Sequence, residues 1–461
     1  MPLVESYVDS IFYCTWSSGF GLFTHNTKVG EVFTCKQKMF ANNITSELIA
    51  QGTDPLRIMI DFCRRNGLEI FWSMRMNDTH DAWGGDYSPY LFPKWKREYP
   101  EYLVGSKEKQ PKHGGWTAVD YTHPQVRELA FRFVEEVCCG YDIDGVELDF
   151  FRHPTLFKRA AMGFPLRQED LDIMTNFMHR IRRMTEEVGE KRGHPILIAV
   201  RVPDSVEYCK GIGIDLERWL REDLVDILIA TGYFRLNPWE NIVKLGHRYD
   251  VPVYACLSES RIPGESGKVR NSIESYRARA MNVWNSGADG VYMFNFFDPH
   301  SSLWRELGDP GILKGLDKVY FVTVRGISNA SFFLSGGEKY FSIPLLYPQK
   351  PLEIKVDRPQ AVELPVGDDV VGGKNRGILP DVNLRFQVGN LKNAGDIMIK
   401  LNGETLSDGI LSGEWLNYSL KPSMVKNGVN RLEMSIEPRS KSAPVVFDLQ
   451  LWIRYKKIPK L

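Results

Sequence analysis

The chain has 461 residues, which is too long for one ordinary domain. Hydrophobic residues make up 43% of it and charged residues 25%, which is typical of a globular protein. The 58 lysines and arginines balance 58 aspartates and glutamates, so no basic excess favours a nucleic acid or an anionic membrane as partner.

The sequence shows no membrane segment and no metal motif. No apolar run is long enough to cross a bilayer, so we expect no membrane partner. The start, MPLVESYVDS, lacks the basic and apolar regions of a signal peptide. It predicts a cytoplasmic protein if the N-terminus is complete, and a periplasmic or secreted one if a leader preceded it. The seven cysteines form no CxxC or Cys/His pattern, and we expect neither a cofactor nor a bound metal.

Short apolar runs recur through the first 320 residues. They are rich in β-branched and aromatic residues, which is typical of strands. Seven such runs cover residues 10–16, 68–76, 145–151, 196–202, 225–231, 251–257 and 290–296.

The stretches between these runs have helical periodicity. In DPLRIMIDFCRRNG, Asp54 is placed to cap a helix, Pro55 suits its first turn and Gly67 lies just past its end. The apolar residues of this stretch recur at i, i+3, i+4 and i+7. Similar helices are predicted over residues 123–140, 168–189 and 272–290.

Strand and helix alternating this often predict a parallel sheet covered by helices. More than six units favour a TIM-type (β/α)8 barrel over an open doubly wound sheet, and no glycine-rich phosphate loop follows an early strand. Seven strands are predicted, and either one has been missed or the barrel is incomplete. We expect a barrel domain over residues 1–320 that lacks its first strand at the N-terminus or takes it from another segment.

From about residue 325 the helical periodicity gives way to short strands bounded by Gly, Asn and Pro. Runs such as VNLRFQVGN, DIMIKLNGETL, EWLNYSLKP, NRLEMSIEP and PVVFDLQLWIRYKK predict an antiparallel β-sandwich over residues 325–461. IMIKLNGETL followed by VKNGVNRLEMSI resembles the jelly-roll accessory modules of many glycoside hydrolases. That resemblance implies a domain that supports the barrel or binds glycan.

The third run, GVELDFFRHP, carries two carboxylates in an apolar strand. Because alternate side chains of a barrel strand face the interior, Glu147, Asp149 and Phe151 should point inward. Asp149 is near the carboxyl end of the strand, where barrel active sites lie, and Glu147 is one layer deeper.

Arginines occupy the matching positions of the neighbouring runs. The same alternation turns Arg75 and Arg201 inward, on either side of Glu147 and Asp149 if chain order equals barrel order. Such pairing would offset the cost of burying the acids. The alternative is an internal salt-bridge network that merely fills the barrel.

GVELDFFRHP resembles the fourth-strand segment of glycosyl-hydrolase-like barrels, in which a strand of type G-[IV]-x-[LF]-D ends in a carboxylate followed by aromatics. Alpha-amylase-type barrels carry a related G-F-R-x-D strand whose last Asp is the nucleophile. Asp149 matches that Asp, whereas Glu147 stands where that strand has Arg. The resemblance implies a glycosidase with Asp149 as a catalytic carboxylate.

Glycoside cleavage requires a second carboxyl group across the scissile bond. We expect Glu259, in ACLSESR, to be that partner of Asp149. Asp204 and Glu207, in RVPDSVEY, are alternatives, and so is a pair formed by Glu147 with Glu259.

Further polar and aromatic residues follow predicted strand ends and are candidates for binding sugar. The segment from residue 78 to 121 is too long for an ordinary βα loop and is rich in Trp and Tyr, which predicts aromatic platforms on the catalytic face, although part of them should pack within the loop. The candidate substrate-binding residues are Arg75, Asn77, His80, Trp83, Arg152, His153, Arg201, Tyr233 and Asn295.

These patterns predict a glycoside hydrolase that cleaves O-glycosidic bonds in an oligo- or polysaccharide, with carbohydrate as its partner and an unknown oligomeric state. One alternative is a non-catalytic carbohydrate-binding or scaffold protein on a barrel. Another is a barrel enzyme of different chemistry, such as a metal-dependent hydrolase or a lyase.

Overall fold

A computed structural model of the chain describes residues 3–16, 18–326, 328–356, 358–372, 378–436 and 443–457. These residues form two compact units. The barrel unit comprises Val8–Tyr254 and Ile327–Phe341, and the sandwich unit comprises Met1–Tyr7, Ala255–Gly326 and Ser342–Leu461. Among the described residues, no helix combines the length and the apolar character that crossing a membrane requires.

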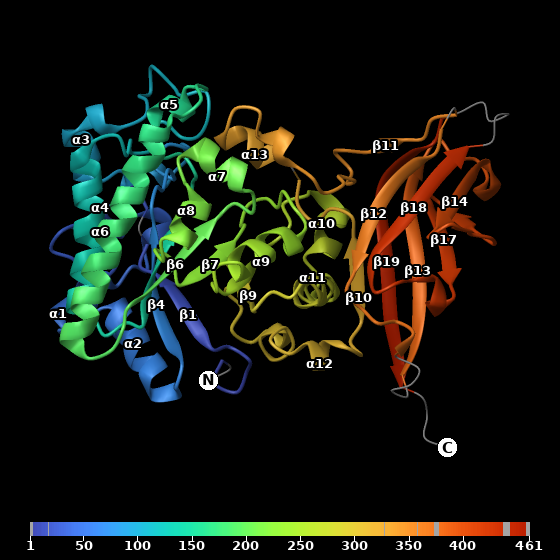
Figure 1. Cartoon of the computed structure of the whole chain (residues 1–461), viewed down its shortest axis with the longest axis horizontal. Coiled ribbons are helices and arrows are strands. Elements are labelled where there is room, and N and C mark those ends of the chain that lie inside the picture. Colours follow the sequence, from blue (N-terminus) through green and yellow to red (C-terminus); the bar gives the residue numbers. More distant parts are fainter. Residues whose placement is uncertain are drawn as a thin grey trace. The chain divides into compact units, whose positions relative to one another are not determined.

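Seven strands form one sheet, in the order of the chain (Figure 1). Each successive pair from the first to the fifth strand of this sheet is parallel. The strands are β1 (Ser10–Cys14), β4 (Glu69–Arg75), β5 (Gly145–Asp149), β6 (Leu197–Val202), β7 (Ile227–Ala230), β8 (Val253–Leu257) and β9 (Gly290–Met293). All seven coincide with the predicted apolar runs. Within the described residues β1 and β9 are the edges of this sheet, so the prediction of a partial (β/α)8 barrel with seven strands is confirmed.

Helices connect these strands, as the periodicity predicted. The helix α2 begins after Asp54, whose carboxylate accepts the Arg57 N–H at 3.0 Å, and it ends at Gly67, whose φ of 66° suits glycine. The connecting helices are α1 (Thr45–Ala50), α2 (Pro55–Asn66), α3 (Lys94–Glu98), α4 (Pro124–Gly140), α5 (Lys158–Ala161), α6 (Gln168–Arg192), α7 (Val206–Ile212), α8 (Leu216–Arg221), α9 (Trp239–His247), α10 (Gly264–Arg270) and α11 (Ile273–Asn285). The remaining helices of the described residues are α12 (Pro310–Leu313) and α13 (Ser328–Phe333). Short 3-10 turns occur at η1 (Lys38–Phe40), η2 (Ser88–Leu91), η3 (Pro100–Tyr102), η4 (Ser302–Arg305), η5 (Gly337–Tyr340), η6 (Ala394–Asp396) and η7 (Pro422–Met424).

Aspartates at the amino ends of two strands bind the backbone of the preceding strand. Asp144 comes directly before β5, and its carboxylate accepts the Ile70 N–H of β4 at 2.7 Å. Asp226, before β7, accepts the Ile198 N–H of β6 at 2.6 Å. Each aspartate therefore holds two neighbouring strands in register at the end opposite the candidate site.

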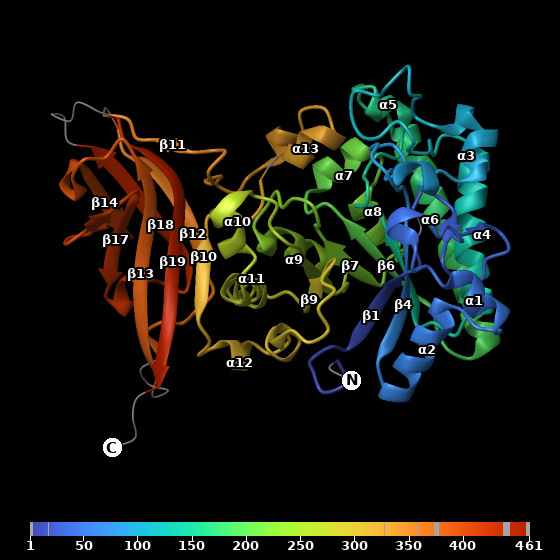
Figure 2. The ribbon, with the colours of Figure 1, turned by 180° about the vertical axis from the view of Figure 1, so that it is seen from behind.

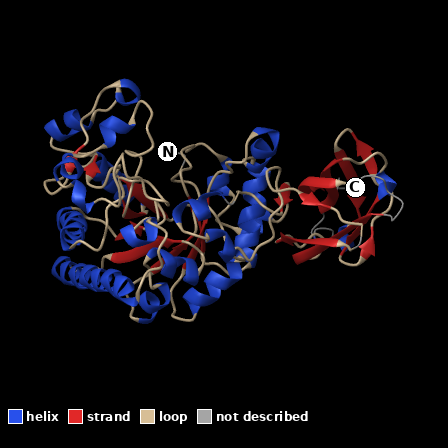
Figure 3. Cartoon of the chain, turned by 90° about the horizontal axis from the view of Figure 1, so that it is seen from above, coloured by secondary structure: helices blue, strands red, loops and turns tan. Residues whose placement is uncertain are grey.

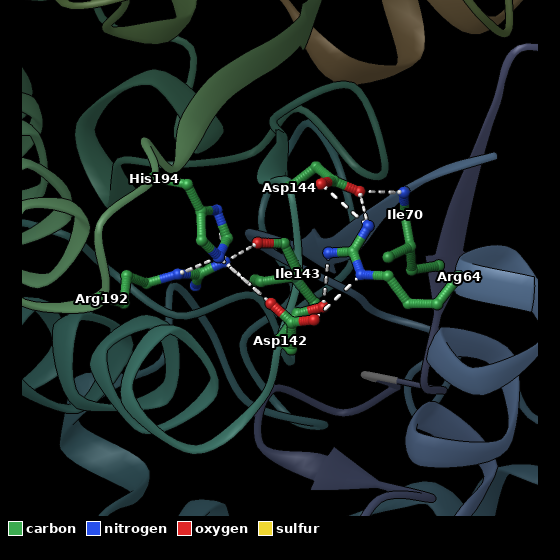
Figure 4. A network of polar contacts seen from close by, with 7 residues as sticks. All are labelled: Arg64, Ile70, Asp142, Ile143, Asp144, Arg192 and His194. Carbon is green, nitrogen blue, oxygen red and sulfur yellow. Dashed lines mark hydrogen bonds and ion pairs between the residues drawn. The ribbon is translucent and has the colours of Figure 1, made fainter. Parts of the chain in front are cut away.

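A polar network surrounds Asp144 at this end of the sheet (Figure 4). Arg64 donates to Asp144 at 2.8 Å and to Asp142 at 2.9 Å. His194 and Arg192 approach Asp142 at 3.2 and 3.4 Å. The network joins α2, the start of β5 and the end of α6.

The C-terminal part of the chain is an antiparallel sandwich of two sheets, as predicted (Figures 2 and 3). One sheet has the order β10-β19-β13-β17-β16, with β11 paired to β19, and the other has the order β12-β18-β14-β15. The last two residues of the predicted run at 430–438 lie outside the described residues. The strands are β10 (Lys318–Phe321), β11 (Leu352–Glu353), β12 (Gln360–Val366), β13 (Ile378–Gly389), β14 (Ile397–Leu401), β15 (Glu404–Thr405), β16 (Ile410–Ser412), β17 (Trp415–Leu420), β18 (Gly428–Ile436) and β19 (Val445–Lys457), and the short ribbon β2 (Leu22–Phe23) with β3 (Glu31–Val32) lies in the barrel unit.

A buried ion pair fixes α10 to the sandwich within the sandwich unit. Arg270 of α10 binds both carboxylate oxygens of Asp448 in β19, at 2.8 and 2.6 Å, and both side chains are fully buried. Such a bidentate pair holds its partners in one orientation. It is one of the contacts that join residues 255–326 to the sandwich in one unit.

Candidate functional site

The predicted inward-facing residues meet on three adjacent strands. In the sheet register Asp149 lies between Arg75 and Arg201, and Glu147 lies between Ser73 and Ala199. The Nη2 of Arg201 donates to Oδ2 of Asp149, and its Nε lies 3.8 Å from Oε1 of Glu147. Glu147 and Arg201 are fully buried and Asp149 is 3% exposed. The predicted register is therefore confirmed.

The chain turns back around Asp149 directly after β5. The Oδ1 of Asp149 accepts the backbone N–H groups of Phe151 and Arg152, at 3.0 and 3.1 Å. Both oxygens of this carboxylate are thus held, and the same turn places Arg152 and His153 beside the end of β4.

A chain of polar contacts runs from Arg75 to Arg152 through Asp78 and His80. Arg75 donates to Oδ2 of Asp78 at 2.8 Å, and Oδ1 of Asp78 lies 2.7 Å from Nδ1 of His80. Arg152 donates to Nε2 of His80 at 3.2 Å. Because a guanidinium group only donates, His80 accepts at Nε2 and carries its proton on Nδ1, facing Asp78. Burial alone would raise the pKa of Asp78, but Arg75 and His80 hold it well below its usual range.

His153 is a buried neutral histidine with aromatic rings around it. Its Nδ1 accepts the backbone N–H of Thr79 at 3.1 Å, so the ring carries its proton on Nε2. Burial lowers the pKa of His153 well below its ordinary value. Its ring centroid lies 5.7 Å from that of Trp83, 5.9 Å from Tyr233 and 5.8 Å from Phe333.

Part of this aromatic wall comes from α13, which the sequence did not predict as part of the site. Phe332 lies 5.2 Å from Trp83, ring centroid to ring centroid, and these two side chains are 37% and 45% exposed. The hydroxyl of Tyr208 in α7 donates to the Ala330 carbonyl at 2.8 Å, and Gly114 donates to the Phe332 carbonyl at 2.9 Å. The paired aromatics of ASFF, which fall inside the range 325–461 predicted as the sandwich, were the sequence signal for this segment.

The aromatic residues of the long loop after β4, residues 78–121, lie partly at the site and partly within the loop itself. Trp83 reaches the site, whereas Trp95, Tyr99 and Tyr102 stack on one another with centroids 5.7 to 5.9 Å apart. Tyr121 is buried, and its hydroxyl donates to the Met76 carbonyl at 2.6 Å. Most of these rings therefore support the loop.

Asn77 does not present its side chain to a ligand. It is fully buried, its amide donates to the carbonyls of Val119 and Thr155, and its oxygen accepts the Val119 N–H at 3.0 Å. We interpret it as a residue that orders the loop, because these backbone contacts engage both its nitrogen and its oxygen.

Two of the predicted site residues, Glu259 and Asn295, belong to the sandwich unit. Glu259 follows β8, and its side chain is 60% exposed and 3.7 Å from Arg261. Asn295 follows β9, is exposed and has a φ of 52°. Their roles as partner carboxyl and sugar ligand stay predictions.

The other candidate acids differ in their surroundings. Asp204 is 2% exposed, just past the end of β6, and accepts the backbone N–H groups of Leu236 and Asn237 at 2.9 to 3.1 Å. Burial raises the pKa of Asp204 to about 6, against the opposing effect of these hydrogen bonds. Glu207 is exposed in the first turn of α7 and accepts a hydrogen bond from Ser205 at 3.1 Å.

Three side chains of the site are close enough to share a cation. Ligand atoms of Asp78, His80 and His153 lie within 4.8 Å of one another. However, Arg75 and Arg152 already bind Asp78 and His80. Like charges 4 Å apart repel by about 4 kcal/mol at an effective dielectric constant near 20, so a metal ion is disfavoured while these arginines stay in place.

No protein-family model matches the sequence, and no curated protein matches it. Among solved structures, the chain is similar to the PgaB (BpsB) glycoside hydrolase domain from Bordetella bronchiseptica, with a TM-score of 0.41, 11% identity and coverage of 67% of this chain and 91% of that one. It is also similar to a glycoside hydrolase family 18 N-acetylglucosaminidase from Paenibacillus barengoltzii, with a TM-score of 0.38, 12% identity and coverage of 65% and 98%. An alpha-L-fucosidase from Paenibacillus thiaminolyticus gives a TM-score of 0.38, 15% identity and coverage of 68% and 44%. Similarities at this level transfer neither an activity nor a site residue to this chain.

Proposed function

We propose that this protein is a glycoside hydrolase that cleaves O-glycosidic bonds in an oligo- or polysaccharide, with Asp149 as one of two catalytic carboxyl groups. The supporting observation is the position of Asp149, the last residue of β5, at the carboxyl end of a parallel barrel strand. Arg201 and the turn after β5 hold both of its oxygens, which fixes the direction from which a sugar carbon would be attacked.

The surrounding residues suit the other tasks of this chemistry. The exposed rings of Trp83 and Phe332 offer an apolar face for a sugar ring, while Arg75 and Arg152 offer hydrogen-bond donors and charge. In a retaining reaction Asp149 would attack the anomeric carbon, and in an inverting one it would remove a proton from water.

The second carboxyl group has four candidates, and one of them, Glu207, is exposed in the first turn of α7. Asp204 has a pKa raised to about 6 by burial, which suits a group that must hold a proton, although its oxygens accept backbone hydrogen bonds. Glu147 is fully buried one layer below Asp149, so a substrate could reach it only after rearrangement. Glu259 is freely accessible to solvent.

The test is hydrolysis of a panel of polysaccharides and aryl glycosides, with release of reducing ends as the readout. For every substrate that the wild-type protein cleaves, Asp149→Asn should lower kcat by orders of magnitude with little change in KM, because the loss falls on the transition state. Asp142→Asn is the matched control, since Asp142 precedes the opposite end of β5 and has a side chain 58% exposed. Full turnover by a folded Asp149→Asn protein would place the catalytic carboxylate elsewhere.

A second candidate function is non-catalytic binding of carbohydrate. The specific observation in its favour is that Glu147, Asp149 and Arg201 are at most 3% exposed and that Arg201 pairs with both acids, as expected of a structural network inside the barrel. Binding of a glycan by wild-type protein without turnover, unchanged in Asp149→Asn, would favour this function. Metal content of the purified protein tests the metal-dependent alternative separately.

A further inference from the structure

The loop after β7, residues 231–238, lies against the candidate site. A Cβ atom added at Gly232 would be 2.6 Å from Nη1 of Arg201 and 3.0 Å from the Phe151 ring. The loop backbone therefore lies directly on the arginine that binds Asp149, and no side chain fits between them.

Two aromatic side chains of this loop form part of the wall of the site. The Tyr233 ring stacks on His153, with centroids 5.9 Å apart and planes within 14° of parallel, and it lies 5.7 Å from the Phe151 ring. The Phe234 ring lies 4.9 Å from Phe151, and both loop side chains are buried. Because Phe151 and His153 follow Asp149 closely in the chain, the position of the loop fixes the surroundings of the candidate carboxylate.

A buried carboxylate holds the other end of the loop. Oδ1 and Oδ2 of Asp204 accept the Leu236 N–H at 3.0 and 3.1 Å, and Oδ2 also accepts the Asn237 N–H at 2.9 Å. The Asn237 side chain donates to the Asp204 carbonyl at 2.8 Å, and Leu236 is fully buried. Hydrogen bonds to an ionised acceptor are stronger than those between neutral groups, so these contacts tie the loop to the end of β6.

The same contacts distinguish Asp204 from a proton donor. A general acid must present its O–H to the leaving group, whereas both oxygens of Asp204 face backbone N–H groups of the loop. We infer that Asp204 is a positioning residue of the proposed reaction, which holds this loop against Arg201. The loop in turn keeps the Tyr233 ring beside the turn that follows Asp149. The inference rests on the proposed hydrolase function and removes Asp204 from the candidates for the second carboxyl group.

Hydrogen–deuterium exchange, followed by mass spectrometry on the full chain, tests the hold on the loop without any substrate. In wild-type protein the peptide that spans residues 231–238 should exchange slowly. Asp204→Asn replaces one acceptor oxygen with an N–H₂ group that faces backbone donors, so exchange in this peptide should rise about tenfold or more. Asp226→Asn is the matched control, because Asp226 accepts the Ile198 N–H at the opposite end of β6, and it should leave this peptide unchanged.

The kinetic test compares aryl glycosides that have the same sugar and differ in their leaving group. Dinitrophenol leaves readily without a proton, whereas phenol needs a general acid. If Asp204 positions the loop, Asp204→Asn should lower kcat/KM about 10- to 100-fold for both glycosides alike. If Asp204 were the acid, the phenyl glycoside alone would lose several orders of magnitude. Asp226→Asn should keep the wild-type kinetics for both.

Gly232→Ala tests the loop from its other end and also serves if Asp204→Asn does not fold. Its added methyl group would lie 2.6 Å from Nη1 of Arg201, so the loop must shift while Asp204 stays intact. This variant should reproduce the equal loss of kcat/KM on both glycosides.

Three results would overturn the inference. The first is exchange in residues 231–238 that is fast in wild-type protein or unchanged in Asp204→Asn. The second is a loss confined to the phenyl glycoside, and the third is wild-type kinetics in both loop variants. If wild-type protein cleaves no glycoside, the hydrolase proposal fails, and the exchange data still decide whether Asp204 holds the loop.

Discussion

Arg201 and Asp149 lie opposite each other on neighbouring strands, and Nη2 of the arginine donates to Oδ2 of the aspartate inside the sheet. The same guanidinium group lies 3.8 Å from Glu147 through its Nε. One buried cation thus faces two buried carboxyl groups, so the residue that would support the proposed chemistry of Asp149 also contributes to the stability of the barrel.

Replacing Arg201 with methionine should therefore destabilise the protein strongly. Both carboxyl groups would remain buried without this partner, and removing one member of a buried ion pair costs about 3 to 5 kcal/mol. Urea unfolding followed by tryptophan fluorescence measures the change. The double variant Arg201→Met with Glu147→Gln should recover part of the loss, and additive losses would show that the two side chains do not interact.

The carboxylate of Asp144 should stabilise the barrel from the other end. Asp144→Ala removes the acceptor for the Ile70 N–H and for Arg64, and leaving a partly buried donor unsatisfied costs about 1 to 3 kcal/mol (Figure 4). Asp226→Ala should behave alike, because Asp226 accepts the Ile198 N–H. Asp142→Ala is the control and should lose less than about 1 kcal/mol, since its side chain is 58% exposed. Equal losses for Asp142 and Asp144 would mean that the backbone hydrogen bond contributes nothing.

The strands and their register could be predicted because they depend on local patterns. Apolar runs rich in β-branched and aromatic residues predicted all seven barrel strands, and alternation along them placed Arg75, Asp149 and Arg201 on one face. Parallel strands in chain order then bring these positions together. The ends of α2 could be predicted for the same reason, because the capping residues Asp54 and Gly67 are recognised from the local sequence.

The remaining parts of the site depend on contacts between distant segments. Phe332 and Phe333 reach the site because α13 returns to the barrel unit, where Ala330 accepts a hydrogen bond from Tyr208, 122 residues earlier. No periodicity in the sequence predicts that α13 packs within the barrel unit. Asn77 follows a strand end as a sugar ligand would, yet its amide is used by the backbone of Val119 and Thr155. Residue type and position alone do not distinguish these two roles.

Acidification should destabilise the protein through His25. Thr15 accepts the Trp72 indole N–H at 2.8 Å, and its hydroxyl oxygen lies 2.8 Å from Nδ1 of His25. Burial lowers the pKa of His25 to about 4. The ordinary value is about 6.5, so the unfolded chain binds the proton first as the pH falls. The contribution of His25 is complete above pH 6.5 and is lost as the pH falls to about 4, by about 3 kcal/mol in all.

Chemical unfolding from pH 8 to pH 4 measures this loss against His25→Asn, which cannot take up a proton. The difference in unfolding free energy between the two proteins should shrink as the pH falls below 6.5. A difference that stays constant across this range would show that His25 titrates alike in the folded and unfolded states.

Phe332 should contribute binding energy for the sugar ring without taking part in the chemistry. Its ring lies 5.2 Å from Trp83 and is 37% exposed, whereas Phe333 beside it is 5% exposed and packs on His153. Phe332→Ala removes an apolar surface that binds ground state and transition state equally, so KM should rise about fivefold with kcat unchanged. Tyr99→Ala is the control, because the Tyr99 ring contacts are with Trp95 and Tyr102 inside the loop. Trp83→Ala should raise KM at least as much, and the double variant should add little, since each ring supports the other. A fall in kcat with KM unchanged would instead assign α13 to the transition state, and unchanged kinetics in both single variants would remove this pair of rings from the site.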